Sequence, residues 1–350
     1  MAFRVTPFSV FREVLMQSRR VLLSLVVAFF LLRVQGARSL AAESVYLVLQ
    51  KAESSMGFYS PAGMHLASVP VGKHPHEFVI SSDGRYAYTT DNGTMLLEQA
   101  GQGGNTVSIV DLVNRKRVGE ISLGEFRRPH GIDLDRKTGH LAISCELPDR
   151  LLIIDPASRK MVRHYDTQGK TSHMVTLGLG AQWAFVSNST SNNVAAIHLE
   201  TGKAKLIPTS RRPEGSVLSK DGSTLYVATR EGISIIETGK QVEVGRIVSG
   251  KGPNRIGLTP DERYLVYSLI EENKVEVADP KTHKVLGQIP LQGRPVSLSV
   301  SRDGKYAFAS AQDDDTVYVV SIAERKIARI FKTAKGAGPD PVQEVLIRMP

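Results

Sequence analysis

The most restrictive feature of this 350-residue sequence is a pattern that recurs about every forty residues. Each copy starts at an anchor residue, usually proline, and four copies carry an aspartate eight residues later, as in R-P-E-G-S-V-L-S-K-D-G from Arg212. The anchors are Pro75, Pro129, Ser172, Pro213, Pro253, Pro295 and Pro339, separated by 54, 43, 41, 40, 42 and 44 residues. An internal period of this length predicts a fold built from one repeated unit.

Each period contains the same succession of short apolar segments. An alternating segment leads to an Asp-Gly turn, a β-rich run such as T-L-Y-V-A-T, a third segment such as N-K-V-E-V-A-D, and a fourth such as K-V-L-G-Q-I-P-L-Q-G. Alternation with a period of two, bounded by turn residues, predicts β-strands. Four short antiparallel strands per period, repeated around a ring, predict an all-β fold, the β-propeller.

The two ends of the repeat region complete one another. Residues 44–72 have the pattern of the second, third and fourth strands of a unit, whereas the segment after Pro339 has the pattern of a first strand. Pairing the two ends would close the ring and remove exposed sheet edges. Six complete units and this composite blade predict a seven-bladed propeller of four-stranded antiparallel blades. We expect it to fill residues 42–350 as a single, monomeric domain.

The repeat also resembles that of a known family. The string N-T-V-S-I-V-D from Asn105, the G-x-x-P and S-x-D-G-x-x-x-Y elements and the period resemble the YVTN-repeat (YncE-like) β-propellers, which are exported bacterial and archaeal proteins. The resemblance covers nearly all of the chain after residue 41. Its motif residues form turns and strands, so it implies a fold more than a function. More distantly, the chain is similar to the haem d1-binding propellers of nitrite reductase and to the lactonase propellers.

Residues 1–41 have the pattern of an export signal. Arginines precede a twelve-residue, mainly apolar run from Val21 to Leu32, and small residues follow up to Ala42. This run is short for a membrane span and suits a secretory signal peptide. We therefore expect cleavage near Ala41 and a periplasmic or secreted protein without a stable membrane span. The stretch S-R-R-V-L-L from Ser18 also resembles a twin-arginine signal, so Sec and twin-arginine export both stay open.

Removal of this segment changes the charge balance. The segment holds six arginines and one glutamate, so the formal net charge falls from +9 to about +4. A nucleic-acid partner thereby loses its main support. The single cysteine, Cys145, excludes an intrachain disulfide and any C-x-x-C or C-x-x-C-H motif.

The residue after each anchor is expected at one mouth of the central channel. In a propeller, the loop that enters the first strand lies on the same face as the loop between the second and third strands. Around the ring, this slot holds His76, His130, His173, Glu214, Asn254, Val296 and Asp340. Further candidates for ligand binding lie beside it, namely Glu77, Arg128, Arg212 and Arg255.

Three imidazoles from consecutive blades permit more than one chemistry. His76, His130 and His173 could bind a metal such as zinc or copper, with Glu77 or Glu214 as a ligand or base. They could instead hold a planar anionic cofactor whose carboxylates pair with the arginines. As a third possibility, each histidine could simply hydrogen-bond a loop carbonyl. The identity of any cofactor therefore stays open.

The first complete unit carries an insertion between its second and third strands. The extra residues lie within D-N-G-T-M-L-L-E-Q-A-G-Q-G-G from Asp91, on the face of the histidines. The apolar segment Met95–Leu97 could cover the mouth as a lid or contact a partner. It could equally be a tolerated surface elongation.

The sequence contains no catalytic string such as G-x-S-x-G or H-E-x-x-H. We therefore interpret the chain as an exported propeller that binds an anionic small molecule or a protein partner at the channel-mouth face. The alternative is an enzyme or cofactor protein that uses the three histidines. It would be either a metal-assisted, lactonase-like hydrolase or a haem d1-type tetrapyrrole binder.

Overall fold

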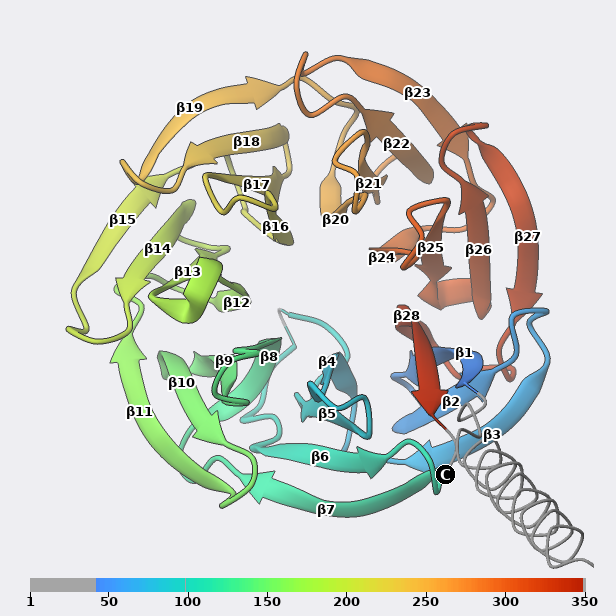
Figure 1. The fold of residues 1–350 in the computed structure, drawn as a ribbon, viewed down its shortest axis with the longest axis horizontal. Helices are drawn as coiled ribbons and strands as arrows, with labels where there is room; N and C mark the ends of the chain where they lie inside the picture. The colour runs from blue at the N-terminus through green and yellow to red at the C-terminus, as the bar shows by residue number, and fades with distance from the viewer. Residues whose placement is uncertain (1–41, 98, 349–350) are drawn as a thin grey trace, which may run out of the picture. The chain divides into compact units, whose positions relative to one another are not determined.

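The computed structural model describes residues 42–97 and 99–348, and the repeats appear in it as seven four-stranded sheets (Figure 1). Residues Glu43–Ile347 form one unit, in which the sheets follow one another around a ring. In six sheets, the strands are hydrogen-bonded in the order of the chain. The predicted all-β, seven-bladed propeller is therefore confirmed. The predicted export signal, residues 1–41, lies outside the described residues.

The first and second strands of the blades form the inner part of the ring. The first strands are β28 (Pro339–Arg348), β4 (Pro75–Ile80), β8 (Arg127–Leu134), β12 (Ser172–Leu177), β16 (Ser216–Leu218), β20 (Pro253–Leu258) and β24 (Pro295–Val300). The second strands are β1 (Ala42–Gln50), β5 (Tyr86–Asp91), β9 (Leu141–Leu147), β13 (Trp183–Asn188), β17 (Thr224–Thr229), β21 (Leu265–Leu269) and β25 (Tyr306–Ala311).

The third and fourth strands form the outer part (Figure 1). The third strands are β2 (Ser55–Tyr59), β6 (Thr106–Asp111), β10 (Asp149–Asp155), β14 (Asn193–His198), β18 (Gly232–Glu237), β22 (Lys274–Ala278) and β26 (Thr316–Ser321). The fourth strands are β3 (His65–Pro70), β7 (Lys116–Ser122), β11 (Lys160–Asp166), β15 (Ala204–Pro208), β19 (Val242–Ile247), β23 (Val285–Pro290) and β27 (Lys326–Lys332). Two short 3-10 turns, Leu179–Ala181 and Gln312–Asp314, lie between strands.

Burial follows the position of a strand within its blade. Every residue of the third strand β26 is buried, whereas the outermost strand β27 alternates between exposed and covered positions. The third strands are covered on both faces because neighbouring blades pack against them. Tyr88 and Ile109 of one blade, for example, share a core with Ile143 of the next. Each such side chain contributes about 1.5–3 kcal/mol through the hydrophobic effect.

The ring is closed within a composite blade, as predicted. Strand β28 from the C-terminal part of the chain pairs with β1, and β2 and β3 complete the sheet. Tyr46 of β1 packs on the neighbouring blade β24–β27, with its ring centroid 4.7 Å from that of Phe308 and 6.1 Å from that of Phe331. The closure therefore combines a strand pair with an aromatic contact between blades.

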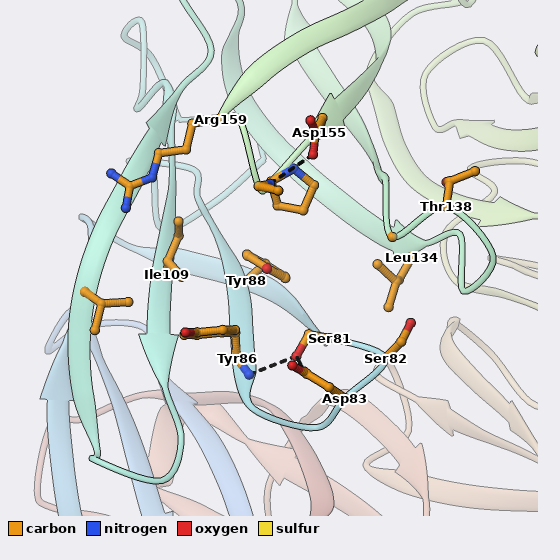
Figure 2. A pocket seen from close by; sticks show the side chains of 14 residues that line it. Ser81, Ser82, Asp83, Tyr86, Tyr88, Ile109, Leu134, Thr138, Asp155 and Arg159 are labelled. Carbon is orange, nitrogen blue, oxygen red and sulfur yellow. Dashed lines mark hydrogen bonds between the residues drawn. The ribbon is translucent and has the colours of Figure 1, made fainter.

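A hollow of about 650 Å³ lies between the blades β4–β7 and β8–β11, at the end of the Asp-Gly turns (Figure 2). Tyr86 and Tyr88 contribute to its wall. Asp83, which also lines it, accepts hydrogen bonds from Ser81 Oγ and the Arg85 amide, and these lower the pKa of its carboxyl. Its polar groups thus stabilise turns, and none of the candidate site residues reaches this hollow.

Candidate functional site at the channel mouth

The residues that follow the anchors meet at one end of the channel. All seven of them line a cavity of about 160 Å³, which we call the inner chamber: His76, His130, His173, Glu214, Asn254, Val296 and Asp340. Six are buried, and Val296 is half-buried. Their side chains converge because the register between the first and second strands recurs from blade to blade. Pro75 pairs with Asp91, for instance, as Pro253 does with Leu269.

A second ring of side chains comes from the ends of the second strands. Antiparallel pairing brings these ends beside the anchors, so the residue after each anchor's partner also lies at the mouth. This slot holds Asn92, Glu146, Ser189, Ile270 and Gln312, and Lys51 and Arg230 follow the ends of the second strands β1 and β17 in the same way. We did not predict the charged members Lys51, Glu146 and Arg230. The same repeat register, counted along the second strand, would have identified them.

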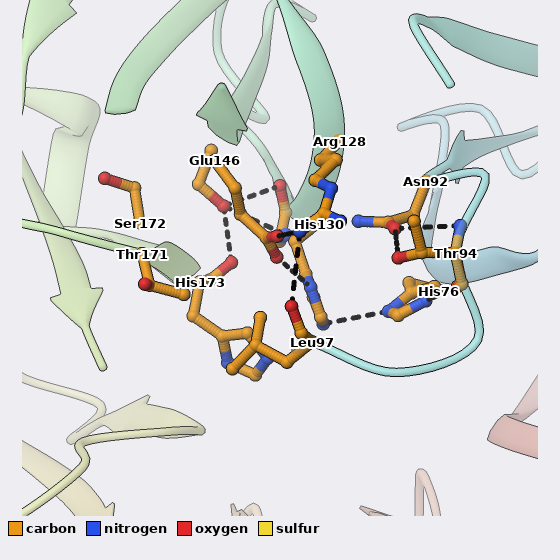
Figure 3. Close-up of polar contacts among 12 residues, drawn as sticks. His76, Asn92, Thr94, Leu97, Arg128, His130, Glu146, Thr171, Ser172 and His173 are labelled. Atoms are coloured by element: carbon orange, nitrogen blue, oxygen red, sulfur yellow. Dashed lines mark hydrogen bonds and ion pairs between the residues drawn. The ribbon is translucent and has the colours of Figure 1, made fainter. Parts of the chain in front are cut away.

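Two of the histidines and Glu146 form a chain of hydrogen bonds that ends on the insertion (Figure 3). Glu146 Oε1 lies 2.8 Å from His130 Nδ1, and His130 Nε2 lies 3.1 Å from His76 Nδ1. His76 Nε2 lies 2.8 Å from the carbonyl oxygen of Thr94. His173 packs against this chain, with its ring centroid 3.7 Å from that of His130.

The Thr94 carbonyl determines the direction of every hydrogen bond in this chain. A carbonyl oxygen only accepts, so His76 Nε2 carries a proton and donates it. Burial, reinforced by the charge of Lys51, holds the pKa of His76 well below its usual value, so its Nδ1 is an acceptor. His130 Nε2 must therefore donate to His76.

The same reasoning gives the protonation state of Glu146. Burial, with His173 and His76 nearby, keeps the pKa of His130 well below its usual value, so His130 is neutral and its Nδ1 accepts. Glu146 must then supply the proton between them. Burial raises the pKa of Glu146 to about 8, against the opposing charge of Arg128. Glu146 is thus a neutral hydrogen-bond donor at neutral pH.

Glu214 has the opposite protonation in a neighbouring part of the site. Its carboxylate lies 2.9 Å from His173 Nδ1, 2.8 Å from Arg212 Nε and 3.5 Å from Arg230 Nη2. Burial alone would raise the pKa of Glu214, but His173 and Arg255 overcome this effect and hold it at about 2. The mouth therefore combines a protonated and an ionised glutamate, the pattern in which one group can donate a proton while the other stays charged.

The hydrogen bonds of His76 and His130 do not fit a three-histidine metal site. Both ring nitrogens of each residue lie within hydrogen-bonding distance of protein atoms, so neither offers a lone pair to a common centre. Within residues 42–97 and 99–348, no group of three or more His, Cys, Asp or Glu side chains is arranged to hold a metal ion. Metal binding by His76, His130 and His173 stays a prediction, and it would require these bonds to rearrange.

Glu77 and Arg255 pair with each other across the channel. Glu77 Oε1 on β4 lies 3.0 Å from Arg255 Nη2 and 3.1 Å from Arg255 Nε on β20. Burial raises the pKa of Glu77 to about 7, although Arg255 acts against this shift. Lys51 and Asp340 form a second buried pair, with 3.2 Å between Nζ and Oδ2. Lys51, Asp340 and Arg255 of these two pairs belong to the lining of the inner chamber.

Three arginines at the mouth each have one guanidinium nitrogen without a hydrogen-bond acceptor. Among the described residues, the buried nitrogens without a hydrogen-bond partner include Arg128 Nε, Arg230 Nη1 and Arg255 Nη1. A buried N–H group without a partner costs about 1–3 kcal/mol, and more when the group is charged. Three such nitrogens on the residues of one mouth leave donors free for an acceptor there.

The backbone beside two of the arginines is also strained. Arg128 and Arg212 precede anchor prolines with φ values of 53° and 55°. Gly252 and Gly338 occupy the equivalent slot in other blades, with φ values of 75° and 63°. An L-residue in this left-handed region costs about 1–2 kcal/mol relative to its usual conformation. His74 and Thr171 occupy this slot too, with φ values of 45° and 59°, so the left-handed backbone belongs to the repeat rather than to the arginines.

A second cavity of about 890 Å³, the outer chamber, adjoins the inner one. Its wall carries six cationic side chains but only three carboxyl groups, Glu146, Asp149 and Glu271. The cationic residues are Arg128, Lys170, Arg211, Arg212, Arg230 and Arg294. Thr171 and Thr190, whose hydroxyl groups hydrogen-bond each other, also line it, as does Ser189, whose hydroxyl group donates to the carbonyl oxygen of Pro213. The field at this face is therefore positive, and the concave surface strengthens it.

The insertion covers the mouth, on the face predicted for it. Met95, Leu96 and Leu97 line the inner chamber. Arg128 Nη1 donates to the carbonyl oxygen of Leu97 over 3.2 Å (Figure 3). Arg128 Nη2 donates to the carbonyl oxygen of Gln99. The position of the segment is thus established, whereas its movement as a lid stays a prediction.

Comparisons with known proteins identify the fold but no function. No protein-family model matches the chain, so the resemblance to the YVTN-repeat family stays a prediction. The curated protein "Antigen Lp49" of Leptospira interrogans is 28% identical over 158 residues. This match covers 42% of the present chain but only 34% of the antigen, about a third of that protein's length.

Three solved structures resemble the propeller. A functionally unknown protein from Desulfotomaculum acetoxidans has a TM-score of 0.72 and 14% identity, with 87% of this chain and 99% of that chain covered. Dihydro-haem d1 dehydrogenase NirN in complex with DHE has a TM-score of 0.61 and 17% identity, covering 83% and 64%. Kuenenia stuttgartiensis hydrazine synthase has a TM-score of 0.60 and 18% identity, covering 71% and 76%. Identities this low support a shared fold alone. Among the described residues, no helix has the length and apolar character needed to span a membrane.

Proposed function

We propose that this protein is an exported propeller of the YVTN-repeat type that binds an anionic small molecule at the channel mouth. The observation that carries the proposal is the lack of acceptors for Arg128 Nε, Arg230 Nη1 and Arg255 Nη1, all buried. An oxyanion would supply these acceptors, and charge-assisted hydrogen bonds to guanidinium groups are among the strongest in proteins. Export is supported by the pattern of residues 1–41.

The shape of the mouth favours a small molecule over a protein partner. The outer chamber is concave, its volume of about 890 Å³ falls in the range of small-molecule sites, and two of the three residues with an unpartnered nitrogen, Arg128 and Arg230, line it. A protein partner would have to insert a narrow acidic segment to reach them. We therefore regard a protein at this face as the weaker version of the proposal.

Charge-neutralising variants test anion binding. Arg128 and Arg212 are replaced by glutamine together, and binding of phosphate, citrate and gluconate is measured by calorimetry at low and high salt. Arg302, an exposed arginine beside an Asp-Gly turn, provides the matched control as Arg302→Gln. We expect the double variant to bind at least tenfold more weakly and to lose much of the salt dependence, with no effect of the control. Absence of any anion binding to the unmodified protein would contradict the proposal.

The Glu146–His130–His76 chain favours a second function, in which the mouth holds a cofactor or catalyses a reaction. A protonated carboxyl group at one end of two hydrogen-bonded imidazoles is a reasonable proton donor for a bound substrate. The haem d1-type binder and the lactonase-like hydrolase belong to this class. The absorbance spectrum and metal content of protein purified from its native periplasm separate this function from simple binding. A colourless, metal-free protein without lactonase turnover would argue against it.

A further inference from the structure

The inner and outer chambers share part of their lining, which we call the neck, and differ strongly in size. Leu97, Arg212, Arg230, Ile270 and Arg294 line both cavities. The inner chamber, at about 160 Å³, has space for a group the size of about five water molecules, at about 30 Å³ each. The outer chamber is more than five times larger. A ligand that uses both chambers must therefore have a small end and a larger body.

The charges of the inner chamber define the small end. Five cationic side chains line it, Lys51, Arg212, Arg230, Arg255 and Arg294, but only two carboxyl groups, Glu214 and Asp340. Glu77 lies behind the lining and pairs with Arg255, so it offsets one further charge. Asp313 likewise pairs with Arg294, 3.1 Å from its Nε. Four ionised carboxylates therefore stand against the five cations, and one positive charge remains in this set.

Two donors of the inner chamber are ready for an oxyanion. Arg255 Nη1 and Arg230 Nη1 are buried without a hydrogen bond, and their side chains are only 10% and 11% exposed. The contact nearest to a bond at Arg255 Nη1 is an ion pair with Glu214 Oε2 over 3.9 Å. Their other nitrogens are already directed at Glu77 and Glu214. These pairings hold both guanidinium groups in place before a ligand arrives, which reduces the entropic cost of binding.

We propose that the inner chamber binds the oxyanion head group, a carboxylate or a phosphate, of an elongated ligand whose body occupies the outer chamber. The proposal rests on the anion binding proposed above and specifies its subsite. The head group accepts hydrogen bonds from Arg230 and Arg255. The body passes the neck at Ile270 and meets the hydroxyl groups of Thr171, Ser189 and Thr190 outside.

Paired probes and paired variants test this arrangement. Inorganic phosphate and acetate represent the two head groups, while glucose 1-phosphate and gluconate carry the same groups on a larger body. Affinities are measured by calorimetry for the unmodified protein, for Arg230→Met at the neck, and for Lys170→Met. Lys170 is an exposed residue of the outer chamber, so its variant removes the same charge outside the neck.

We expect Arg230→Met to lower the affinity for the small probe of the preferred head group at least tenfold. Lys170→Met should change that affinity less than twofold. The larger probe with that head group should bind at least tenfold tighter than the small one. Ile270→Trp, which narrows the neck without removing a charge, should weaken both probes and covers the case in which Arg230→Met does not fold. Equal losses in Arg230→Met and Lys170→Met would place the anion in the outer chamber, which overturns this inference but leaves anion binding intact. Absence of binding by all four probes would overturn both.

Discussion

Replacing Glu146 by glutamine should make the protein more stable at neutral pH, although it removes a buried ionisable residue. The protonated carboxyl of Glu146 donates to His130 Nδ1, and a glutamine amide can donate in its place. Glutamine therefore preserves the hydrogen-bond chain through His76 to Thr94. Unlike glutamate, it cannot lose the proton on which the chain depends.

The magnitude follows from the pKa. Folding raises the pKa of Glu146 from its ordinary value of 4.5 to about 8, so between these values the folded state holds a proton that the unfolded state has released. The stability that this group contributes is complete below pH 4.5 and decreases as the pH rises towards 8, by about 1.4 kcal/mol per pH unit. At pH 7 the penalty reaches about 3 kcal/mol. Glu146→Gln should remove this penalty, and the gain should vanish near pH 4.5.

Urea unfolding at pH 5, 6, 7 and 8, followed by far-ultraviolet circular dichroism, measures this difference directly. Glu214→Gln supplies a contrast of opposite sign, because the pKa of Glu214 is held at about 2 in the folded protein. That carboxylate stabilises the fold above pH 4.5, and its removal should cost about 3 kcal/mol at pH 7. A Glu146→Gln variant that is destabilised equally at every pH would refute the reasoning, since Glu146 would then be ionised in the fold.

Three further outcomes are expected. Arg212→Gly should weaken anion binding but leave the free energy of unfolding within about 1 kcal/mol of the unmodified value. Glycine relieves the left-handed strain, as at the equivalent Gly252, and this gain offsets the loss of the ion pair with Glu214. Gly131→Ala should lower the urea midpoint by the equivalent of about 1–3 kcal/mol, because the added Cβ would lie 2.7 Å from the backbone of the next blade. Gly239→Ala is the control and should leave the midpoint unchanged, because its Cβ would lie in open space. Deletion of residues 94–103 should leave the circular dichroism spectrum unchanged. It should accelerate anion release at least tenfold in stopped-flow measurements, because it uncovers the inner chamber. An unchanged release rate would contradict a covering role for this segment.

The sequence predicted the arrangement of the site only for residues that occupy equivalent positions in the repeat. His76, His130 and His173 were placed at one mouth because they occupy the same slot of the repeat, and the strand register carries that slot from blade to blade. Glu146 and Arg230 were missed because they come from the ends of second strands. Those ends reach the mouth through antiparallel pairing rather than through nearness in the chain.

The chemistry of the histidines could not be predicted from the repeat at all. Their protonation depends on the carbonyl of Thr94, which belongs to the insertion and has no counterpart in the other blades. The pairing of Glu77 with Arg255 joins residues 178 positions apart on separate blades. No local pattern contains that information, since it arises only when the ring is closed.

The composite blade makes formation of the site depend on synthesis of the whole propeller. Asp340 on β28 lines the inner chamber and pairs with Lys51, which follows β1. One of the first and one of the last parts of the propeller to be synthesised must therefore meet before the inner chamber exists. A growing or truncated chain that lacks β28 would have neither a closed ring nor a finished site, so competence to bind would appear only once translation of the propeller is complete.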